Sequence, residues 1–403
     1  MTASASARPR VAVVAAVRTP IGKYGGALVS TPAAALGTLV LREALHRARV
    51  EPREVPMVYL GHCIQAGTGQ NPARQAMLGA GLPVTTGAMT VNMVCGSGLQ
   101  AIFLGAQAIR AGEFDLTLVG GMESMSSAPY IVPGKARWGL RYGSTSLEDA
   151  MLKDALLDAY GEHEHMGFSG ERVATDLGLS REEVDRFALR SHHRAAQAVS
   201  DGTFRDEMVS VPGELTPGTT GLDHDEGPRG DTTLERLARL RPSFTPGGLL
   251  TAGNSSQLSD GAAALLLASE AYVSRHGLAP LGWLHSGQVS GVDPAHVMES
   301  PIPTVRRHLE ATGFAPGDFD RVEHNEAFSS ASIAVQRAFG FADTVFNVHG
   351  GAVALGHPIG ASGARIVVTL LHELRRSNGR RGLATLCMGG GNGLSLIVER
   401  DAT

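Results

Sequence analysis

The sequence predicts an α/β protein of layered architecture, and three features of the chain indicate this class. Apolar runs of strand length, rich in valine and leucine, recur at residues 11–17, 116–119 and 382–387. Longer segments with helical spacing of their apolar residues lie between such runs, as at 32–48 and 361–376. Apolar strands that alternate with helices are typical of a sheet covered by helices on both faces. The 403 residues leave room for two or three domains.

The N-terminal part of the chain shows this alternation in order. The run at 11–17 ends at a Pro-Ile-Gly turn and suits a strand buried on both faces, as in a parallel sheet. A helix is predicted at 32–48, a strand at 55–61, a helix at 72–82, and a strand at 116–119 that stops at Gly120-Gly121. Helical spacing from Leu99 to Ile109 adds a helix directly after Cys95.

The middle of the chain has a different texture. Between about 128 and 250 the charge rises and the apolar runs shorten, which predicts an insertion or lid with helices at 180–201 and 232–239. After an apolar run at 260–269, the early alternation returns. Helices are predicted at 301–313, 328–339 and 361–376, and strands at 320–323, 382–387 and 394–399. Because residues 93–98 and 386–391 are also alike, we predict a weak internal duplication.

Composition argues against several classes of protein. The net charge of −4 leaves no basic surplus for nucleic-acid binding. No apolar stretch reaches the roughly 18 residues of a membrane span, and residues 1–10 lack the apolar core of a signal peptide. The three cysteines, Cys63, Cys95 and Cys387, form neither a disulfide framework nor a zinc motif. We therefore expect a cytoplasmic protein that binds neither membrane nor metal.

Cys95 lies in Val-Cys-Gly-Ser-Gly, just before a predicted helix. Free amide protons and the helix dipole at such a position favour a thiolate, which would lower the pKa of the thiol and make it reactive. The flanking glycines would let a substrate carbonyl approach the backbone. A buried structural cysteine in a glycine-rich turn is the alternative interpretation.

His357 lies in Gly-His-Pro-Ile-Gly, where the proline keeps it out of helical geometry and on a loop. An imidazole with a pKa near neutrality suits general-base work on a thiol. The alternative is a histidine that only braces the loop.

Two further motifs carry candidate groups. Cys387 stands at a strand-to-loop junction among glycines and could serve as an acid/base, or its loop as a backbone oxyanion site. Asn325-Glu326 lies at a predicted strand–helix junction and could orient water or a histidine. Taken singly, the Cys387 motif is explained equally well as a tight turn, and the Asn325-Glu326 motif as the start of a surface helix.

Together these motifs resemble the thiolase family. The similarity extends to residues 91–98, 120–126, 165–167, 251–256, 325–328, 356–363 and 387–393, in the family's order. The resemblance implies two similar βαβαβαββ halves in a five-layer αβαβα arrangement with an inserted loop domain. The N-terminal half would occupy residues 1–127, completed by about 256–280. The loop domain for coenzyme A would occupy 128–255 and the C-terminal half 281–403.

The resemblance also implies roles for the motif residues. Cys95 would be the nucleophile that accepts the acyl group, His357 its activator, and Cys387 the acid/base at the α-carbon of a second acetyl group. The amides of Cys95 and Gly389 would form one oxyanion hole, and His357 with a water held by Asn325 a second. The reaction would join two acetyl-CoA into acetoacetyl-CoA and coenzyme A by ping-pong kinetics, with no cofactor.

Contacts to coenzyme A are implied at a longer set of positions. These are His165, Met166, Arg229, Ser243, Phe244, Ala252, Ser255, Leu258, Ala327 and Phe328. Met166 and Met298 match positions that crowd the acyl methyl in short-chain members, which favours acetyl over long acyl groups. For Arg229, a solvated charge on the surface is as good an interpretation as a contact to coenzyme A.

Three other functions remain open at this stage. One is a degradative member of the family with broader chain length. The others are a ketosynthase-like condensing enzyme and a non-catalytic relative that binds acyl-CoA. His349, His324 and Gln257 depart from the family's usual pattern. The resemblance further implies a homodimer or homotetramer, with residues 128–150 as a candidate contact.

Overall fold

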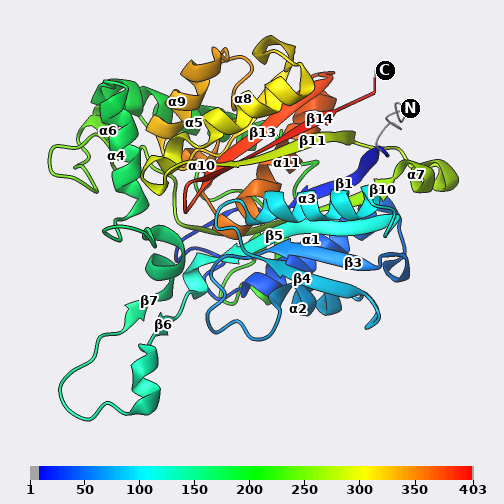
Figure 1. Ribbon diagram of the computed structural model, residues 1–403, viewed down its shortest axis with the longest axis horizontal. Coiled ribbons are helices and arrows are strands. Elements are labelled where there is room, and N and C mark those ends of the chain that lie inside the picture. Colours follow the sequence, from blue (N-terminus) through cyan, green and yellow to red (C-terminus); the bar gives the residue numbers. More distant parts are fainter. Residues whose placement is uncertain (1–8, 402–403) are drawn as a thin grey trace, which may run out of the picture.

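The computed structural model describes residues 9–401. Residues 1–10, which we expected to lack a signal peptide, thus lie mostly outside the described residues. Within that range ten strands form one hydrogen-bonded sheet path, β12-β13-β14-β11-β1-β10-β5-β3-β4, with β2 beside β10 (Figure 1). Their bounds are β1 Val11–Arg18, β2 Gly22–Lys23, β3 Met57–Gly61, β4 Gly87–Val91, β5 Leu116–Ser124, β10 Ser259–Ser269, β11 Gly282–Gly291, β12 Arg321–His324, β13 Arg381–Met388 and β14 Asn392–Glu399.

The path contains the same pairing pattern twice. β1 pairs antiparallel with β10, β10 antiparallel with β5, and β5 parallel with β3. In the C-terminal part β11 pairs antiparallel with β14, β14 antiparallel with β13, and β13 parallel with β12. The two sets meet only where β1 and β11 pair over three residues. This repeat agrees with an internal duplication, but it matches β13 with β5, so residues 386–391 are not equivalent to 93–98.

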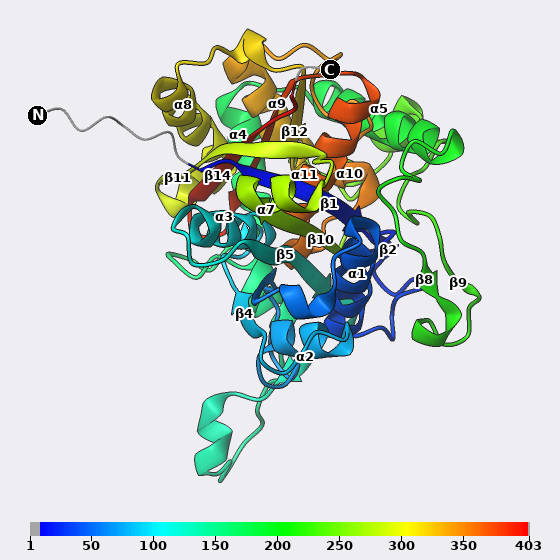
Figure 2. The ribbon, with the colours of Figure 1, turned by 90° about the vertical axis from the view of Figure 1, so that its right-hand side faces the viewer.

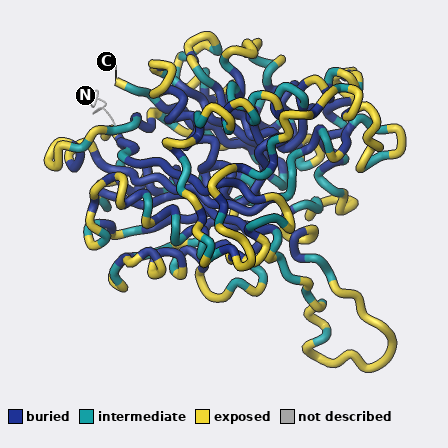
Figure 3. Tube along the Cα trace, turned by 180° about the vertical axis from the view of Figure 1, so that it is seen from behind, coloured by how far each residue is buried: buried dark blue, intermediate teal, exposed yellow. Residues whose placement is uncertain are grey.

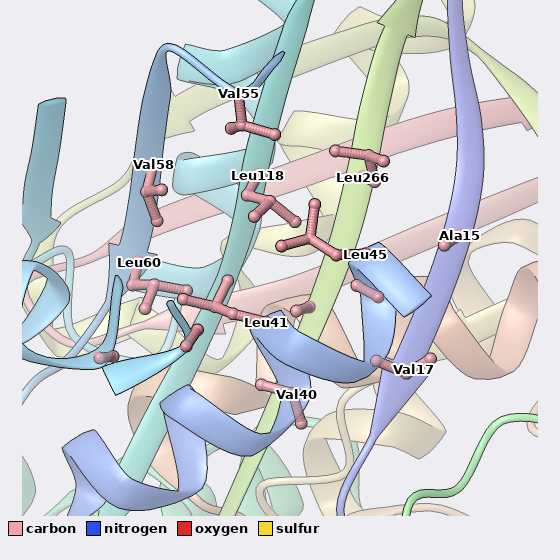
Figure 4. Close-up of a cluster of buried hydrophobic side chains, with 14 of the residues drawn as sticks. Ala15, Val17, Val40, Leu41, Leu45, Val55, Val58, Leu60, Leu118 and Leu266 are labelled. Atoms are coloured by element: carbon pink, nitrogen blue, oxygen red, sulfur yellow. The ribbon is translucent and has the colours of Figure 1, made fainter. Parts of the chain in front are cut away.

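Helices form layers on and between the two sets of strands (Figures 1 and 2). α3 (Ser97–Arg110) and α11 (Ile359–Arg376) share one buried cluster with both sets and form the middle layer. α1 (Ala33–Ala48) and α2 (Pro72–Gly79) cover the outer face of the first set, where α1 packs on β1, β3, β5 and β10 (Figure 4). α8 (Pro301–Thr312) and α9 (Ser329–Phe339) cover the second. The result is the expected five-layer α/β fold.

Two details of the strands differ from prediction. β1 is buried as expected, but it pairs antiparallel with both of its neighbours and not parallel as predicted. The prediction failed because an apolar run indicates that a strand is buried and not the direction of its neighbours. β5 does not stop at Gly120-Gly121 and continues to Ser124. A Cβ at Gly120 would lie 2.1 Å from the Ala263 carbonyl oxygen, and one at Gly121 2.0 Å from the Gly360 oxygen. The glycines therefore admit close neighbours, including the start of α11, instead of ending the strand.

Between β5 and β10 the chain carries helices and very short strands. They are β6 Tyr130–Ile131, β7 Glu148–Asp149, a π-helical turn Leu152–Leu156, α4 Met166–Asp176, α5 Arg181–Ser200, β8 Val211–Pro212, β9 Gly221–Leu222 and α6 Leu234–Ala238. A buried ion pair ties this region to β1, since Arg18 bonds Glu207 at 2.5 Å and Asp225 at 2.7 Å. α7 (Glu270–His276) and α10 (Ala352–Leu355) complete the helices of residues 9–401.

Residues 130–149 form an arm that projects from the molecule (Figures 1 and 3). The two-residue ladder of β6 and β7 closes its base. Its outer part carries exposed apolar side chains, among them Trp138, which is 83% exposed. Within the described part of the chain, none of the helices has the length and apolar character needed to cross a membrane.

Candidate active site

One cavity of about 450 Å³ gathers the motif residues from segments far apart in the sequence. Its size suits a small-molecule ligand. Cys95, His357, Cys387 and Gly389 line it, and Asn325 lies behind His357. All the positions named for coenzyme A and the acyl group also line it: His165, Met166, Arg229, Ser243, Phe244, Ala252, Ser255, Leu258, Met298, Ala327 and Phe328.

Cys95 lies in a tight loop just before α3. Val94, a β-branched residue, has a φ of 49°, a strained conformation that turns the chain sharply ahead of the cysteine. Ser97 fixes this loop, because its Oγ donates to the Val94 carbonyl at 2.6 Å and accepts from the Met93 amide at 2.9 Å. The half-buried thiol thus projects from a strained turn that its neighbours hold in place.

His357 lies in the loop between α10 and α11. Its amide donates to the Gln257 carbonyl at 3.0 Å, which fixes the backbone. Its ring Nδ1 lies 2.6 Å from Ser362 Oγ, and its Nε2 lies 3.5 Å from Asn325 Nδ2. Asn325 is fully buried, and its Oδ1 has no hydrogen-bond partner among the described residues. That free acceptor suits the water-holding role implied for Asn325.

Cys387 is the penultimate residue of β13. Its sulfur is buried and lies 3.7 Å from the Met298 sulfur. The chain then turns through Met388 and Gly389, and the Gly389 backbone hydrogen-bonds the Cys95 thiol. The turn after β13 therefore supplies the Cys387 thiol and also places the Gly389 amide against the Cys95 thiol.

Burial sets the protonation states in this cavity. It raises the pKa of Cys95 to about 12, although backbone hydrogen bonds from Gly389 and Cys95 oppose the shift. It likewise raises the pKa of Cys387 to about 12. Burial, with the Arg365 charge, lowers the pKa of His357 to about 3. The predicted low pKa of the thiol and near-neutral pKa of the imidazole are both wrong, because desolvation outweighs the backbone hydrogen bonds at the thiol and is the largest effect at the imidazole.

Alkylation of Cys95 by iodoacetamide should therefore accelerate with pH without reaching a plateau near neutrality. Below a pKa of about 12 the thiolate fraction rises about tenfold per pH unit, and the rate should follow it between about pH 7 and 9. Peptide mapping by mass spectrometry isolates the Cys95 rate from those of the other cysteines. A plateau below about pH 8 would indicate a preformed thiolate. It would contradict a neutral Cys95 thiol beside a neutral His357 imidazole.

Aromatic rings and one buried hydroxyl line part of the cavity. The rings of His165 and Phe244 stack at 5.0 Å, and Phe244 meets Phe328 edge-on at 5.8 Å. Ser255 Oγ is buried without a hydrogen-bond partner among the described residues. These groups suit a long ligand with an apolar stem and amide groups. Arg229 also lines the cavity, where its charge can meet a phosphate.

Some residues of the site are not among those predicted from the sequence. The π-helical turn supplies an apolar wall through Leu152, Ala155 and Leu156. Glu123 on β5 accepts the amides of Cys63, Ile64 and Gly360, and so holds the start of α11 beside the Cys95 loop. The π-helical turn was not predicted because the sequence around it is irregular and charged. Glu123 stands in the family-like string 120–126, which is the one signal that could have found it.

Of the three departures from the family pattern, His349 and His324 do not line the cavity, whereas Gln257 does. His349 pairs with Glu373 at 2.7 Å, away from His357. His324 is fully buried, with Nδ1 3.0 Å from Ser332 Oγ. Gln257 lines the cavity, and its amide nitrogen donates to the Ala354 carbonyl at 2.9 Å. Gln257 therefore braces the His357 loop through both its side chain and its backbone.

Two thiols, an uncharged imidazole and amide donors around an apolar cavity define a thiol-dependent acyl-transfer enzyme. The family described as "Thiolase, N-terminal domain" matches residues 11–271, and "Thiolase, C-terminal domain" matches residues 278–400. The chain belongs to the thiolase family and is an acyltransferase.

Individual relatives match along nearly the whole chain. The acetyl-CoA acetyltransferase of Pseudomonas aeruginosa is 48% identical, covering 97% of this chain and 99% of the relative. That of Escherichia coli is 45% identical, covering 96% and 98%. The crystal structure of the Bacillus anthracis acetyl-CoA acetyltransferase superposes with a TM-score of 0.94 at 41% identity, covering 98% of this chain and 99% of that one.

Proposed function

We propose that this protein is an acetyl-CoA C-acetyltransferase, which reversibly joins two acetyl-CoA into acetoacetyl-CoA and coenzyme A. The observation that supports this most is the single cavity that Cys95, His357, Cys387 and Gly389 line together. A carbon–carbon bond from a thioester requires an acyl acceptor, an acid/base at the α-carbon and oxyanion donors within one substrate's reach. The same cavity offers a group for each task.

In the first half-reaction, Cys95 Sγ attacks the acetyl carbonyl and passes its proton to His357 Nε2. The amides of Cys95 and Gly389 stabilise the oxyanion, a contribution of typically about 2.7–4 kcal/mol per donor. The bond from the carbonyl carbon to the coenzyme A sulfur then breaks, and the leaving thiolate takes its proton from Cys387. The products are acetyl-Cys95, imidazolium and a Cys387 thiolate.

In the second half-reaction, the Cys387 thiolate removes a proton from the methyl group of a second acetyl-CoA. The protonated His357 and the water position beside Asn325 stabilise the enolate oxygen. The enolate carbon attacks acetyl-Cys95, and the departing Cys95 sulfur recovers its proton from His357. Every group returns to the neutral state that burial favours at rest.

The acyl end of the cavity suits a short chain. Met166, Val297 and Met298 line the cavity and share an apolar cluster with Cys387, and the Met298 sulfur lies 3.7 Å from that of Cys387. One methylene in a tight apolar pocket is worth about 1–3 kcal/mol. Thiolysis of C4, C6 and C10 3-ketoacyl-CoA tests this assignment, and kcat/KM should fall at least about tenfold from C4 to C10. A preference for C10 would indicate the degradative, broad-range alternative.

No separate cofactor takes part in the proposed reaction, because coenzyme A enters as part of the substrate and the proton transfers use cysteine and histidine. Dialysis against a chelator should therefore leave the thiolysis rate unchanged. A loss of activity that a divalent metal restores would contradict this proposal.

We propose a homotetramer on two features of the surface. β4 ends the strand order, and its Met89 is exposed, so an unpaired strand edge is free to meet a second copy. The arm exposes Tyr130, Val132, Trp138, Leu140 and Leu147 far from the core. Light scattering should give four times the chain mass of 42.0 kDa, and Trp138→Ser should shift that mass toward a dimer. A monomer would contradict the proposal.

A further inference from the structure

His357 can serve as a base only through a ring nitrogen that carries a lone pair and faces the cavity. A neutral imidazole has one protonated and one free nitrogen, and the group bonded to one nitrogen decides the state of the other. Burial keeps His357 neutral at rest. The contacts of its ring therefore determine whether Nε2 is a base or a donor.

Ser362, one turn into α11, is the neighbour of the other nitrogen. Its Oγ lies 2.6 Å from His357 Nδ1 and 3.0 Å from the Pro358 carbonyl oxygen. A carbonyl oxygen can only accept, and serine in a helix commonly donates to the i−4 carbonyl, so we assign the single hydroxyl proton to Pro358, whose carbonyl also accepts the amides of Ala361 and Ser362 at 2.9 Å. In this assignment Ser362 Oγ offers only lone pairs to Nδ1, which donates its proton.

The contact at Nε2 agrees with this assignment. Asn325 Nδ2, a donor, lies 3.5 Å from Nε2. A donor beside Nε2 favours the form in which that nitrogen has a lone pair. With the Asn325 amide oriented this way, both partners of the imidazole select the same tautomer. His357 is 7% exposed and Ser362 1%, so bulk water has little access to replace either contact.

We infer that Ser362 is a positioning residue that holds His357 as the Nδ1–H tautomer, with Nε2 free to accept the Cys95 proton. This inference rests on the proposed function for its chemical consequence, but the tautomer itself can be measured without turnover. Once Nε2 takes the proton, the same Oγ accepts from the charged ring at Nδ1. Ser362 therefore serves both the resting base and the imidazolium that follows.

A second buried pair of the same kind supplies the control. His324 Nδ1 lies 3.0 Å from Ser332 Oγ, both residues are fully buried, and neither lines the cavity. Ser362→Ala and Ser332→Ala each remove one serine hydroxyl from a buried histidine. Their effects on stability should be alike, whereas only Ser362→Ala should affect chemistry.

The first test is the nitrogen resonances of ¹⁵N-histidine-labelled protein, with the His357 signal assigned by its loss in His357→Asn. In the wild type, Nδ1 should be protonated and Nε2 free, and Ser362→Ala should convert a measurable fraction to the reverse tautomer. Ser332→Ala should leave the His357 signal unchanged. A protonated Nε2 in the wild type would overturn the inference even if both serine variants failed to fold.

The second test is kinetic. Ser362→Ala should lower kcat of thiolysis about 10- to 100-fold with KM changed less than about twofold, and Ser362→Thr, which keeps the hydroxyl, should recover most of the loss. Equal loss of kcat in Ser332→Ala, or unchanged kcat in a folded Ser362→Ala protein, would overturn it. Absence of acetyl transfer in the wild type, with the Nδ1–H tautomer observed, would instead count against the proposed function.

Discussion

Replacement of Cys95 by serine should abolish the acetyl adduct and lower kcat by a factor on the order of 10⁴ or more. The acyl group would then have to be accepted by a hydroxyl that is a far weaker nucleophile than sulfur, in a site built around the sulfur. Incubation with acetyl-CoA followed by intact mass spectrometry should show one acetyl group on the wild type and none on Cys95→Ser.

Cys63 offers a matched control for that variant. It is also a buried free thiol, its sulfur lies 3.7 Å from the Asp154 carbonyl oxygen, and it does not line the cavity. Cys63→Ser should keep the adduct and most of the activity. If Cys95→Ser still carries an acetyl group, or Cys63→Ser loses it, the nucleophile has been assigned wrongly.

Replacement of Cys387 by serine should separate the two half-reactions. Coenzyme A is a good leaving group without help, so the acetyl adduct on Cys95 should still form. Removal of the α-proton should slow by about 10²- to 10⁴-fold, the usual contribution of a positioned acid/base. Exchange of deuterium from D₂O into the methyl group of acetyl-CoA measures that step separately from condensation.

Met298→Ala serves as the control for packing around Cys387, because the Met298 sulfur lies 3.7 Å away but has no proton to exchange. That variant should keep deuterium exchange within a few-fold of the wild type. Equal slowing of adduct formation and exchange in Cys387→Ser would contradict the division of labour between the two thiols.

Local sequence patterns predicted much of the fold, and the family resemblance implied most of the cavity lining. The helix at 32–48 and the strands at 382–387 and 394–399 were predicted within one or two residues of α1, β13 and β14. Uninterrupted apolar runs and clear helical spacing explain this accuracy. β4 and β11 were missed because their residues are only partly buried and the runs are short of apolar side chains.

What the sequence could not supply depends on burial from distant segments. The flanks of Cys95 correctly indicated a loop before a helix, but the pKa of its thiol is set by the walls that close around it. The role inferred for Ser362 depends on the direction of its hydroxyl proton, which no spacing encodes. The catalytic roles themselves remain predictions for the experiments above.

The most direct test of the central claim is a crystal structure of the enzyme after reaction with acetyl-CoA. The two sulfur atoms come from the two halves of the chain, and in the proposed reaction they act on one bound thioester. The acetyl group should be on Cys95, with its oxygen against the Gly389 amide and the methyl of a second acetyl-CoA beside the Cys387 sulfur. An acetyl group on any other residue, or a second acetyl-CoA bound away from Cys387, would contradict the account.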